Sequence, residues 1–169
     1  MNTRRPTSGS RIALDDPLTD GRQSERALMV WRGTARLLRG LNYACLAEVT
    51  LASGRRADLL AMGPKQELWI VEVKSSIADL KADHKWPDYR QHCDRLFFAT
   101  LPDVPAEIFP GGAGLILSDG FGAEIVREAP EHKLPAPTRK AVSLRFARMA
   151  AQRLHDLQDP DARVPFDLL

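Results

Sequence analysis

Apolar residues recur along this chain with two periods, and each period predicts a different kind of element. From Ser24 to Gly40 they recur three, four and seven positions apart, which is the spacing of one face of an α-helix. Ser24 is a residue type that caps helix N-termini, and Gly40 is a type that ends helices. The same helical spacing returns over residues 138–157. The pattern therefore predicts one helix near the start of the chain and another near its end.

Between these helices the pattern is that of short strands joined by turns. Residues 68–73 read LWIVEV, and a run that is nearly all apolar predicts a strand buried on both faces in the middle of a sheet. The other predicted elements are strands over 43–51, 55–62 and 96–100, a helical region over 77–93 broken at Trp86-Pro87, a loop over 101–112, and a hairpin of 115–118 and 121–127 around Asp119-Gly120.

The order of these elements is α, β, β, β, α, β, β, β, α, without an internal repeat. This order predicts the α/β class, with a single-domain mixed β-sheet flanked by helices. We expect residues 23–158 to form that domain. Residues 1–22 are polar and show no sustained period, so we expect a flexible N-terminal arm, and we expect a C-terminal tail over 159–169.

The composition excludes several classes of protein. With 169 residues, of which 44% are hydrophobic and 27% charged, the chain is neither a disordered nor a membrane protein. No stretch approaches the roughly 20 apolar residues of a membrane span, and no signal peptide is evident. Two cysteines do not make a disulfide framework. The net charge of +2 is too small to indicate nucleic acid by itself. We expect a cytoplasmic protein without a membrane partner.

The candidate chemistry lies in residues 55–76. Glu72 and Lys74 interrupt the most apolar strand of the chain, where an unpaired charge costs several kcal/mol. If strands 55–62 and 68–73 form a hairpin symmetric about Lys65, Asp58 lies opposite Glu72, with Cβ atoms about 4.5–5.5 Å apart. A four-residue loop over 63–66 would instead shift the register by one residue and separate the two carboxylates.

Two carboxylates at that distance repel each other, and a hard divalent cation such as Mg²⁺ would offset the repulsion. With Lys74 beside them, they form a set of groups suited to phosphodiester hydrolysis, in which the metal supplies hydroxide and the ammonium stabilises the transition state. The alternative is structural: an ion pair between Glu72 and Lys74, or between Asp58 and Arg56, at a sheet edge. The residues alone leave both interpretations open.

Longer strings around these residues resemble a known family. Asp58 followed by Glu72-Val73-Lys74 on a central strand resembles the PD-(D/E)xK nuclease superfamily. Within it, RRADLLAM, IVEVKSSIADL and KADHKWPDYRQHCDRLFFA resemble the bacterial MmcB family of DNA repair proteins, which are regarded as endonucleases. The resemblance spans roughly residues 22–158. It implies a restriction-endonuclease-like core and a metal-dependent DNA endonuclease that acts in DNA repair.

The resemblance also assigns roles to particular residues. It implies that Asp58 and Glu72 bind Mg²⁺ or Mn²⁺, with the Val73 carbonyl as a candidate third ligand and Lys74 as the catalytic lysine. Ala57 stands where the superfamily has a proline. The implied partner is DNA, damaged or branched, and the implied location is the nucleoid when the protein is bound to DNA. The oligomeric state stays open.

Further residues are weaker candidates. The accessory candidates for the active site are Glu25, Glu48, Tyr89 and Gln91, and the candidates for contact with nucleic acid are Lys81, Lys85, Trp86, Arg145 and Arg148. A function of another class also stays open, namely a non-catalytic DNA- or partner-binding module on the same fold. A third alternative is a structural α/β domain whose acids only pair with arginines.

Overall fold

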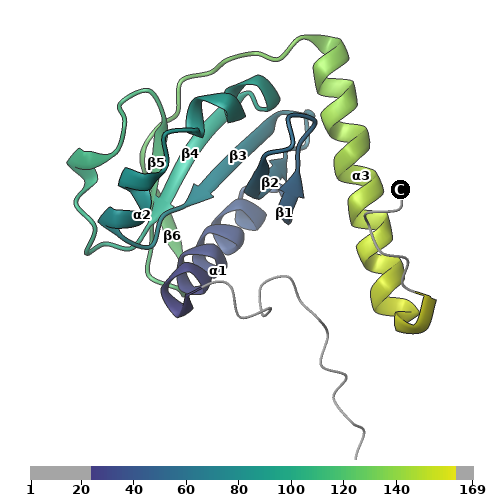
Figure 1. The fold of residues 1–169 in the computed structure, drawn as a ribbon, viewed down its shortest axis with the longest axis horizontal. Helices are drawn as coiled ribbons and strands as arrows, with labels where there is room; N and C mark the ends of the chain where they lie inside the picture. The colour runs from purple at the N-terminus through teal and green to yellow at the C-terminus, as the bar shows by residue number, and fades with distance from the viewer. Residues whose placement is uncertain (1–23, 163–169) are drawn as a thin grey trace, which may run out of the picture.

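Six strands form one sheet, in which their spatial order is their order along the chain (Figure 1). The computed structural model describes residues 24–162. The strands are β1 (Ala44–Thr50), β2 (Arg56–Met62), β3 (Leu68–Val73), β4 (Arg95–Thr100), β5 (Gly114–Ser118) and β6 (Ala123–Arg127). β1, β2 and β3 form an antiparallel meander, β3, β4 and β5 are parallel to one another, and β6 pairs antiparallel with β5. The prediction of a mixed sheet is confirmed.

Helical segments cover both faces of this sheet. α1 (Glu25–Gly40) packs on one face, where Val30 and Leu38 are fully buried in one of two core clusters. The chain passes from β3 to β4 through α2 (Ile77–Ala82) and the 3₁₀ helix η1 (Trp86–His92), whose residues Leu80 and Tyr89 join the core cluster of the opposite face. A further 3₁₀ turn, η2 (Ala106–Ile108), lies between β4 and β5, and another, η3 (Pro160–Ala162), follows the last helix. The single α/β domain with helices on both sides is therefore as predicted.

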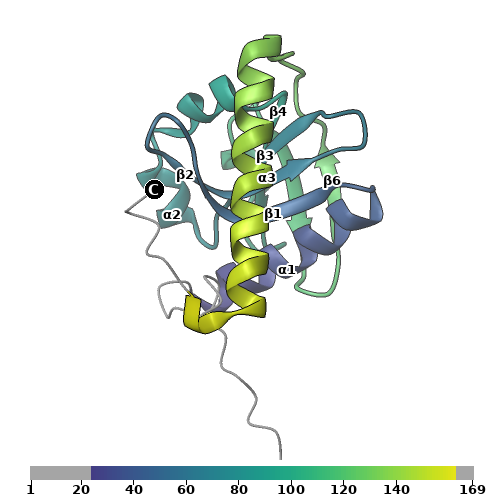
Figure 2. The same ribbon diagram turned by 90° about the vertical axis from the view of Figure 1, so that its right-hand side faces the viewer.

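The long helix α3 (Ala136–Gln158) runs past β1 and crosses in front of the sheet (Figure 2). Val142, Phe146 and Met149 are buried against the core. Several arginines of this helix bond to the rest of the domain. Arg145 donates to the carbonyl of Thr50, and Arg153 donates to the carbonyls of Ala47 and Glu48, so both guanidinium groups cap carbonyls of the edge strand β1. Arg139 pairs with Asp94.

The hairpin of β2 and β3 has the register that places Asp58 opposite Glu72. Leu59 pairs with Val71 and Met62 pairs with Leu68, so the hairpin is symmetric about Lys65, and the alternative register is excluded. The break at Trp86-Pro87 is also confirmed, since α2 ends at Ala82 and a 3₁₀ helix begins at Trp86.

The predicted start of the last strand at residue 121 is wrong, because β6 begins at Ala123. The physical reason lies in the turn that precedes it. One oxygen of the Asp119 carboxylate accepts hydrogen bonds from the N–H groups of Phe121 and Gly122, both at 2.8 Å, and this bonding keeps those two residues in the turn. Gly120 follows Asp119 with a φ of 89°, a value that favours glycine.

Some predictions concern residues outside the described range. The N-terminal arm over 1–22 and most of the C-terminal tail over 159–169 belong to them. Within residues 24–162, no helix has the length and apolar content needed to cross a membrane. Cys45 and Cys93 are free thiols, as expected for a chain without a disulfide framework.

Candidate functional site

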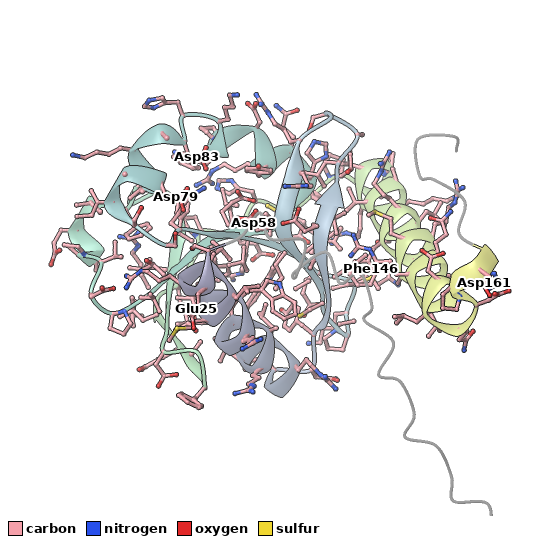
Figure 3. All side chains as sticks on the ribbon, turned by 60° about the horizontal axis from the view of Figure 1, so that its bottom comes forward. Glu25, Asp58, Asp79, Asp83, Phe146 and Asp161 are labelled. Carbon is pink, nitrogen blue, oxygen red and sulfur yellow. The ribbon has the colours of Figure 1, made fainter. Side chains whose placement is uncertain are left out.

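Asp58, Glu72 and Lys74 line one cavity of about 570 Å³. The cavity lies where β2 and β3 meet the first turns of α1 on one side and the α2–η1 segment on the other. Figure 3 shows Asp58 between α1, which carries Glu25, and the α2 segment with Asp79 and Asp83. Residues that are 16 positions apart in sequence thus share one polar cavity, as the hairpin register requires.

The strands β2 and β3 separate where the two carboxylates lie. Regular pairing ends at Leu59 and Val71, and in the next row side chains replace the backbone contacts. The N–H of Asp58 donates to Oε1 of Glu72 over 3.3 Å, and the N–H of Val73 donates to Oδ2 of Asp58 over 2.8 Å. Each carboxylate therefore satisfies a backbone donor of the neighbouring strand, and this bonding fixes its orientation.

A third acid lies in the same row of the sheet. The pairing of β1 with β2 runs from Ala47 and Leu59 directly to Val49 and Ala57, so the row between them sets Glu48 opposite Asp58. Glu48 has a φ of 51°, a left-handed conformation that is rare outside glycine and that concentrates at functional sites. Its side chain is buried and pairs with Arg56 at 2.5 Å. Arg56 therefore pairs with Glu48, and the structural alternative in which it pairs with Asp58 is wrong.

Lys74 follows β3 and its ammonium lies between two carboxylates. Its Nζ is 2.7 Å from Oδ2 of Asp83 and 3.9 Å from Oε2 of Glu72, and its side chain is 8% exposed. The ion pair between Glu72 and Lys74 that the structural alternative proposed is thus present, but the shorter contact is to Asp83.

Asp83 is a site residue that the sequence did not reveal. The charges of residues 79–95 alternate in sign at helical spacing, which usually indicates a solvated helix face. Asp83 instead follows the last residue of α2, and there its side chain turns into the cavity. No sequence signal could have identified it, because its position depends on how α2 and η1 are joined.

Burial changes the charge state of these groups. Burial raises the pKa of Asp58 to about 6, although the Val73 N–H and the Lys74 ammonium act in the opposite direction. Burial and then the negative charge of Asp58 raise the pKa of Glu72 well above its usual value. Burial alone would lower the pKa of Lys74, but the hydrogen bond to Asp83 and the charge of Glu72 raise it. The site therefore holds a charged ammonium beside two carboxylates that the fold disfavours as anions.

These properties fit a hard divalent cation. Oxygen ligands suit Mg²⁺ and Mn²⁺, and a cation would remove the repulsion between Asp58 and Glu72. Backbone N–H groups bond to Oδ2 of Asp58 and Oε1 of Glu72, whereas the ion pairs of the described residues bring no cationic group closer to Oε2 of Glu72 than the Lys74 ammonium at 3.9 Å. Among residues 24–162, no three His, Cys, Asp or Glu side chains already form a metal-binding cluster. The remaining ligands would have to be backbone carbonyls, waters or substrate oxygens; Val73, the predicted carbonyl ligand, does line the cavity.

The accessory candidates differ in where the structure places them. Tyr89 is buried, lines the cavity, and donates its hydroxyl to the Arg56 carbonyl over 3.1 Å. Burial and the nearby charges of Glu72 and Asp58 raise its pKa, so it stays a neutral phenol. Gln91 is exposed and does not line the cavity. Glu25 is exposed in the first turn of α1 and also lies outside the lining (Figure 3).

The candidates for contact with nucleic acid are equally divided. Lys85 lines the cavity, whereas Lys81 is exposed outside its lining. Trp86 packs edge-on against Phe98, with ring centroids 5.9 Å apart, and the guanidinium of Arg90 lies over its ring. It therefore acts as a packing residue rather than as a free stacking surface. Arg148 is exposed on α3, but Arg145 on the same helix is half-buried and already bonded to Thr50.

A family model of known proteins covers most of this chain. The model described as DNA repair protein MmcB-like matches residues 14–161, a span that contains every residue of the cavity described above. The chain belongs to the MmcB-like family of DNA repair proteins. The function of this MmcB-like chain is therefore related to DNA.

A solved structure has the same fold. It is that of a protein of unknown function from Silicibacter pomeroyi, which is 42% identical and superposes with a TM-score of 0.81. The alignment covers 85% of this MmcB-like chain and 99% of that chain, so the two share the whole α/β domain. No curated protein matches the chain.

Proposed function

We propose that this protein is a metal-dependent deoxyribonuclease of the PD-(D/E)xK type that hydrolyses phosphodiester bonds in DNA repair. The observation that carries the proposal is the convergence of Asp58, Glu72 and Lys74 in one cavity, where two buried carboxylates repel each other beside a charged ammonium. A purely structural group of acids would pair fully with arginines, whereas here Arg56 pairs with Glu48 and leaves Asp58 to its backbone donor.

Asp58 and Glu72 would hold Mg²⁺ or Mn²⁺ through the carboxylate oxygens that face the cavity. Bound there, the cation would lower the pKa of a coordinated water and neutralise charge on the scissile phosphate. The Val73 N–H keeps Asp58 oriented, and the Asp58 N–H does the same for Glu72. Lys74 stays protonated, so its ammonium can position the attacking water and stabilise the negative charge of the transition state.

The substrate we propose is DNA in a damaged or branched form. The lining of the cavity includes Lys85, whose exposed side chain can neutralise a phosphate near the site, and also Arg55 and Arg56, which pair with Asp88 and Glu48. Lys81 and Arg148, both exposed, are the remaining candidates for contact with the backbone further from the cavity.

A non-catalytic DNA- or partner-binding module is the second candidate. One observation favours it: within residues 24–162, no cluster of three side chains is already arranged for a metal. On this alternative Lys74 would only neutralise Asp83 and Glu72.

The experiment that separates the two candidates is an incubation of the full chain with several DNA forms in Mg²⁺, Mn²⁺ or EDTA. The forms are duplex, single-stranded, flap, junction and crosslinked DNA. We expect cation-dependent cleavage of at least one form, and its loss in Asp58→Ala while DNA binding persists. Binding without cleavage in every form and with both cations would instead support the module.

A further inference from the structure

Lys74 is held both at its backbone and at the end of its side chain. Its backbone N–H donates to the Ala99 carbonyl over 2.9 Å, and its carbonyl accepts the Thr100 hydroxyl over 2.7 Å. These contacts anchor the residue to β4, the neighbouring parallel strand. At the other end, Nζ lies 2.7 Å from Oδ2 of Asp83. The position of the ammonium is therefore set by two independent contacts, one from the sheet and one from the α2–η1 segment.

The two carboxylates near the ammonium are not equivalent partners. The Asp83 contact has the length of a charge-assisted hydrogen bond, whereas the 3.9 Å to Glu72 is an ion pair without hydrogen-bond contact. A small rotation of the lysine side chain would close that gap if Asp83 did not hold it. The ammonium would then lie on Oε2 of Glu72, the oxygen of that carboxylate that does not bond to Asp58.

Asp83 can hold the ammonium because its own carboxylate is oriented by the backbone. Oδ1 accepts the N–H of Lys85 over 3.0 Å, which leaves Oδ2 directed at Lys74. Its side chain is 14% exposed, so water screens the contact weakly. The turn between α2 and η1 thus presents one carboxylate oxygen at a fixed place in the cavity.

We propose that Asp83 is the positioning residue for Lys74: it keeps the ammonium away from Glu72, so that Oε2 of Glu72 stays open to a divalent cation. This inference rests on the proposed function, because it concerns the same cation. It assigns Asp83 an indirect role, in which the aspartate acts on the cation through the lysine rather than as a ligand. The effect of losing Asp83 must therefore depend on the presence of Lys74.

A double-mutant cycle tests that dependence. Binding of Mn²⁺ to the full chain is measured by titration calorimetry for the parent protein, Asp83→Ala, Lys74→Met and the double variant. We expect Asp83→Ala to weaken Mn²⁺ binding at least about tenfold, as is typical of residues that orient metal ligands. In the Lys74→Met background the same change should weaken binding by no more than about twofold. The control Asp88→Ala removes an ion pair with Arg55 that does not involve Lys74, and it should leave Mn²⁺ affinity within about twofold.

Thermal unfolding in EDTA establishes that each variant is folded. If Asp83→Ala does not fold, Asp83→Asn replaces it, because the amide oxygen can still accept the Lys85 N–H while the charge that holds Lys74 is lost. Equal Mn²⁺ affinity in the parent and the Asp83 variant would overturn the positioning role, as would an equal loss with and without Lys74. A parent protein that binds no Mn²⁺ would overturn the proposed function and this inference together, so the two failures are distinguishable.

Discussion

Asp58 and Glu72 each accept a hydrogen bond from a backbone N–H of the strand that carries the other. Oδ2 of Asp58 takes the N–H of Val73 on β3, and Oε1 of Glu72 takes the N–H of Asp58 on β2. The strands diverge at this row, and the carboxylates fill the gap that the missing ladder contacts leave. The arrangement holds two carboxylates that repel each other close together and in fixed orientations. A divalent cation bound between them would offset this repulsion.

The first prediction concerns the pH dependence of stability without a cation. An acid whose pKa is raised by folding favours the folded state when it is protonated. The contribution of Asp58 to the free energy of unfolding is therefore fully present below its ordinary pKa of 3.8. It is lost as the pH rises through about 6, the pKa in the folded state. Asp58→Asn keeps an oxygen for the Val73 N–H but cannot ionise. In EDTA at pH 7 we expect it to raise the free energy of unfolding by about 2–3 kcal/mol.

Urea denaturation at pH 4 and at pH 7 checks this prediction. The gain in free energy of unfolding of Asp58→Asn over the parent protein should fall to a small fraction of its pH 7 value at pH 4, where Asp58 is protonated in the folded state and only partly ionised in the unfolded chain. A gain of the same size at both pH values would show that the ionisation of Asp58 does not limit stability.

The second prediction concerns the packing of α1 on the β5–β6 turn. A Cβ atom added at Gly33 would lie 2.3 Å from the Gly122 carbonyl oxygen, which is backbone and cannot move aside cheaply. We expect Gly33→Ala to lower the free energy of unfolding by about 2–3 kcal/mol. Gly40, in the same helix, has nothing within 4 Å of the same position. Gly40→Ala should leave the stability within about 0.5 kcal/mol, and similar losses for both variants in urea denaturation would contradict the packing described here.

The third prediction concerns the ion pair that attaches α3 to the sheet. Asp94 is 5% exposed, and its carboxylate accepts two hydrogen bonds from Arg139 as well as the N–H groups of Leu68 and Leu134. Asp94→Ala leaves a half-buried guanidinium and two backbone donors without this partner. We therefore expect the free energy of unfolding to fall by about 3–5 kcal/mol. Asp88→Ala, which breaks a more exposed pair with Arg55, should cost less than about 1 kcal/mol. Equal losses in urea denaturation would contradict this difference.

The fourth prediction concerns the choice of cation. Ca²⁺ accepts carboxylate ligands but is larger and less demanding in geometry than Mg²⁺. We expect Ca²⁺ to support DNA binding, measured by fluorescence anisotropy, while cleavage of the same DNA is much slower than in Mg²⁺. Cleavage at equal rates in both cations would show that the cation has no specific part in the reaction.

The sequence predicts the part of the site that depends on periodicity. The two-residue period of β2 and β3 and the turn centred on Lys65 determine which faces the carboxylates share, and these features placed Asp58 opposite Glu72. The buried strand LWIVEV could be recognised because its charges interrupt an otherwise apolar run. These features depend on residues that are close together in the chain, so they can be predicted from one sequence.

Other parts of the site depend on contacts between distant segments. Asp83 reaches Lys74 only because of the path of the α2–η1 connection, and helical charge spacing predicted solvent exposure instead. Arg145 and Arg153 reach carbonyls of β1 across roughly 95 to 106 positions of sequence, a distance that no periodic pattern encodes. The left-handed φ of Glu48 is likewise invisible in the sequence, because glutamate is not a residue that favours it.

The proposed role of Lys74 in metal-dependent DNA cleavage is tested most directly by single-turnover cleavage of supercoiled plasmid in Mg²⁺. The parent protein and Lys74→Met are compared, with DNA binding measured in parallel. Lys74 provides the positive charge next to the carboxylates, and methionine keeps the length of its side chain. We predict nicking by the parent protein that stops in EDTA, and a loss of at least about 100-fold in the variant at unchanged DNA affinity. Nicking by Lys74→Met at the parent rate, or none by the parent protein on this plasmid and on every DNA form tested, would contradict it.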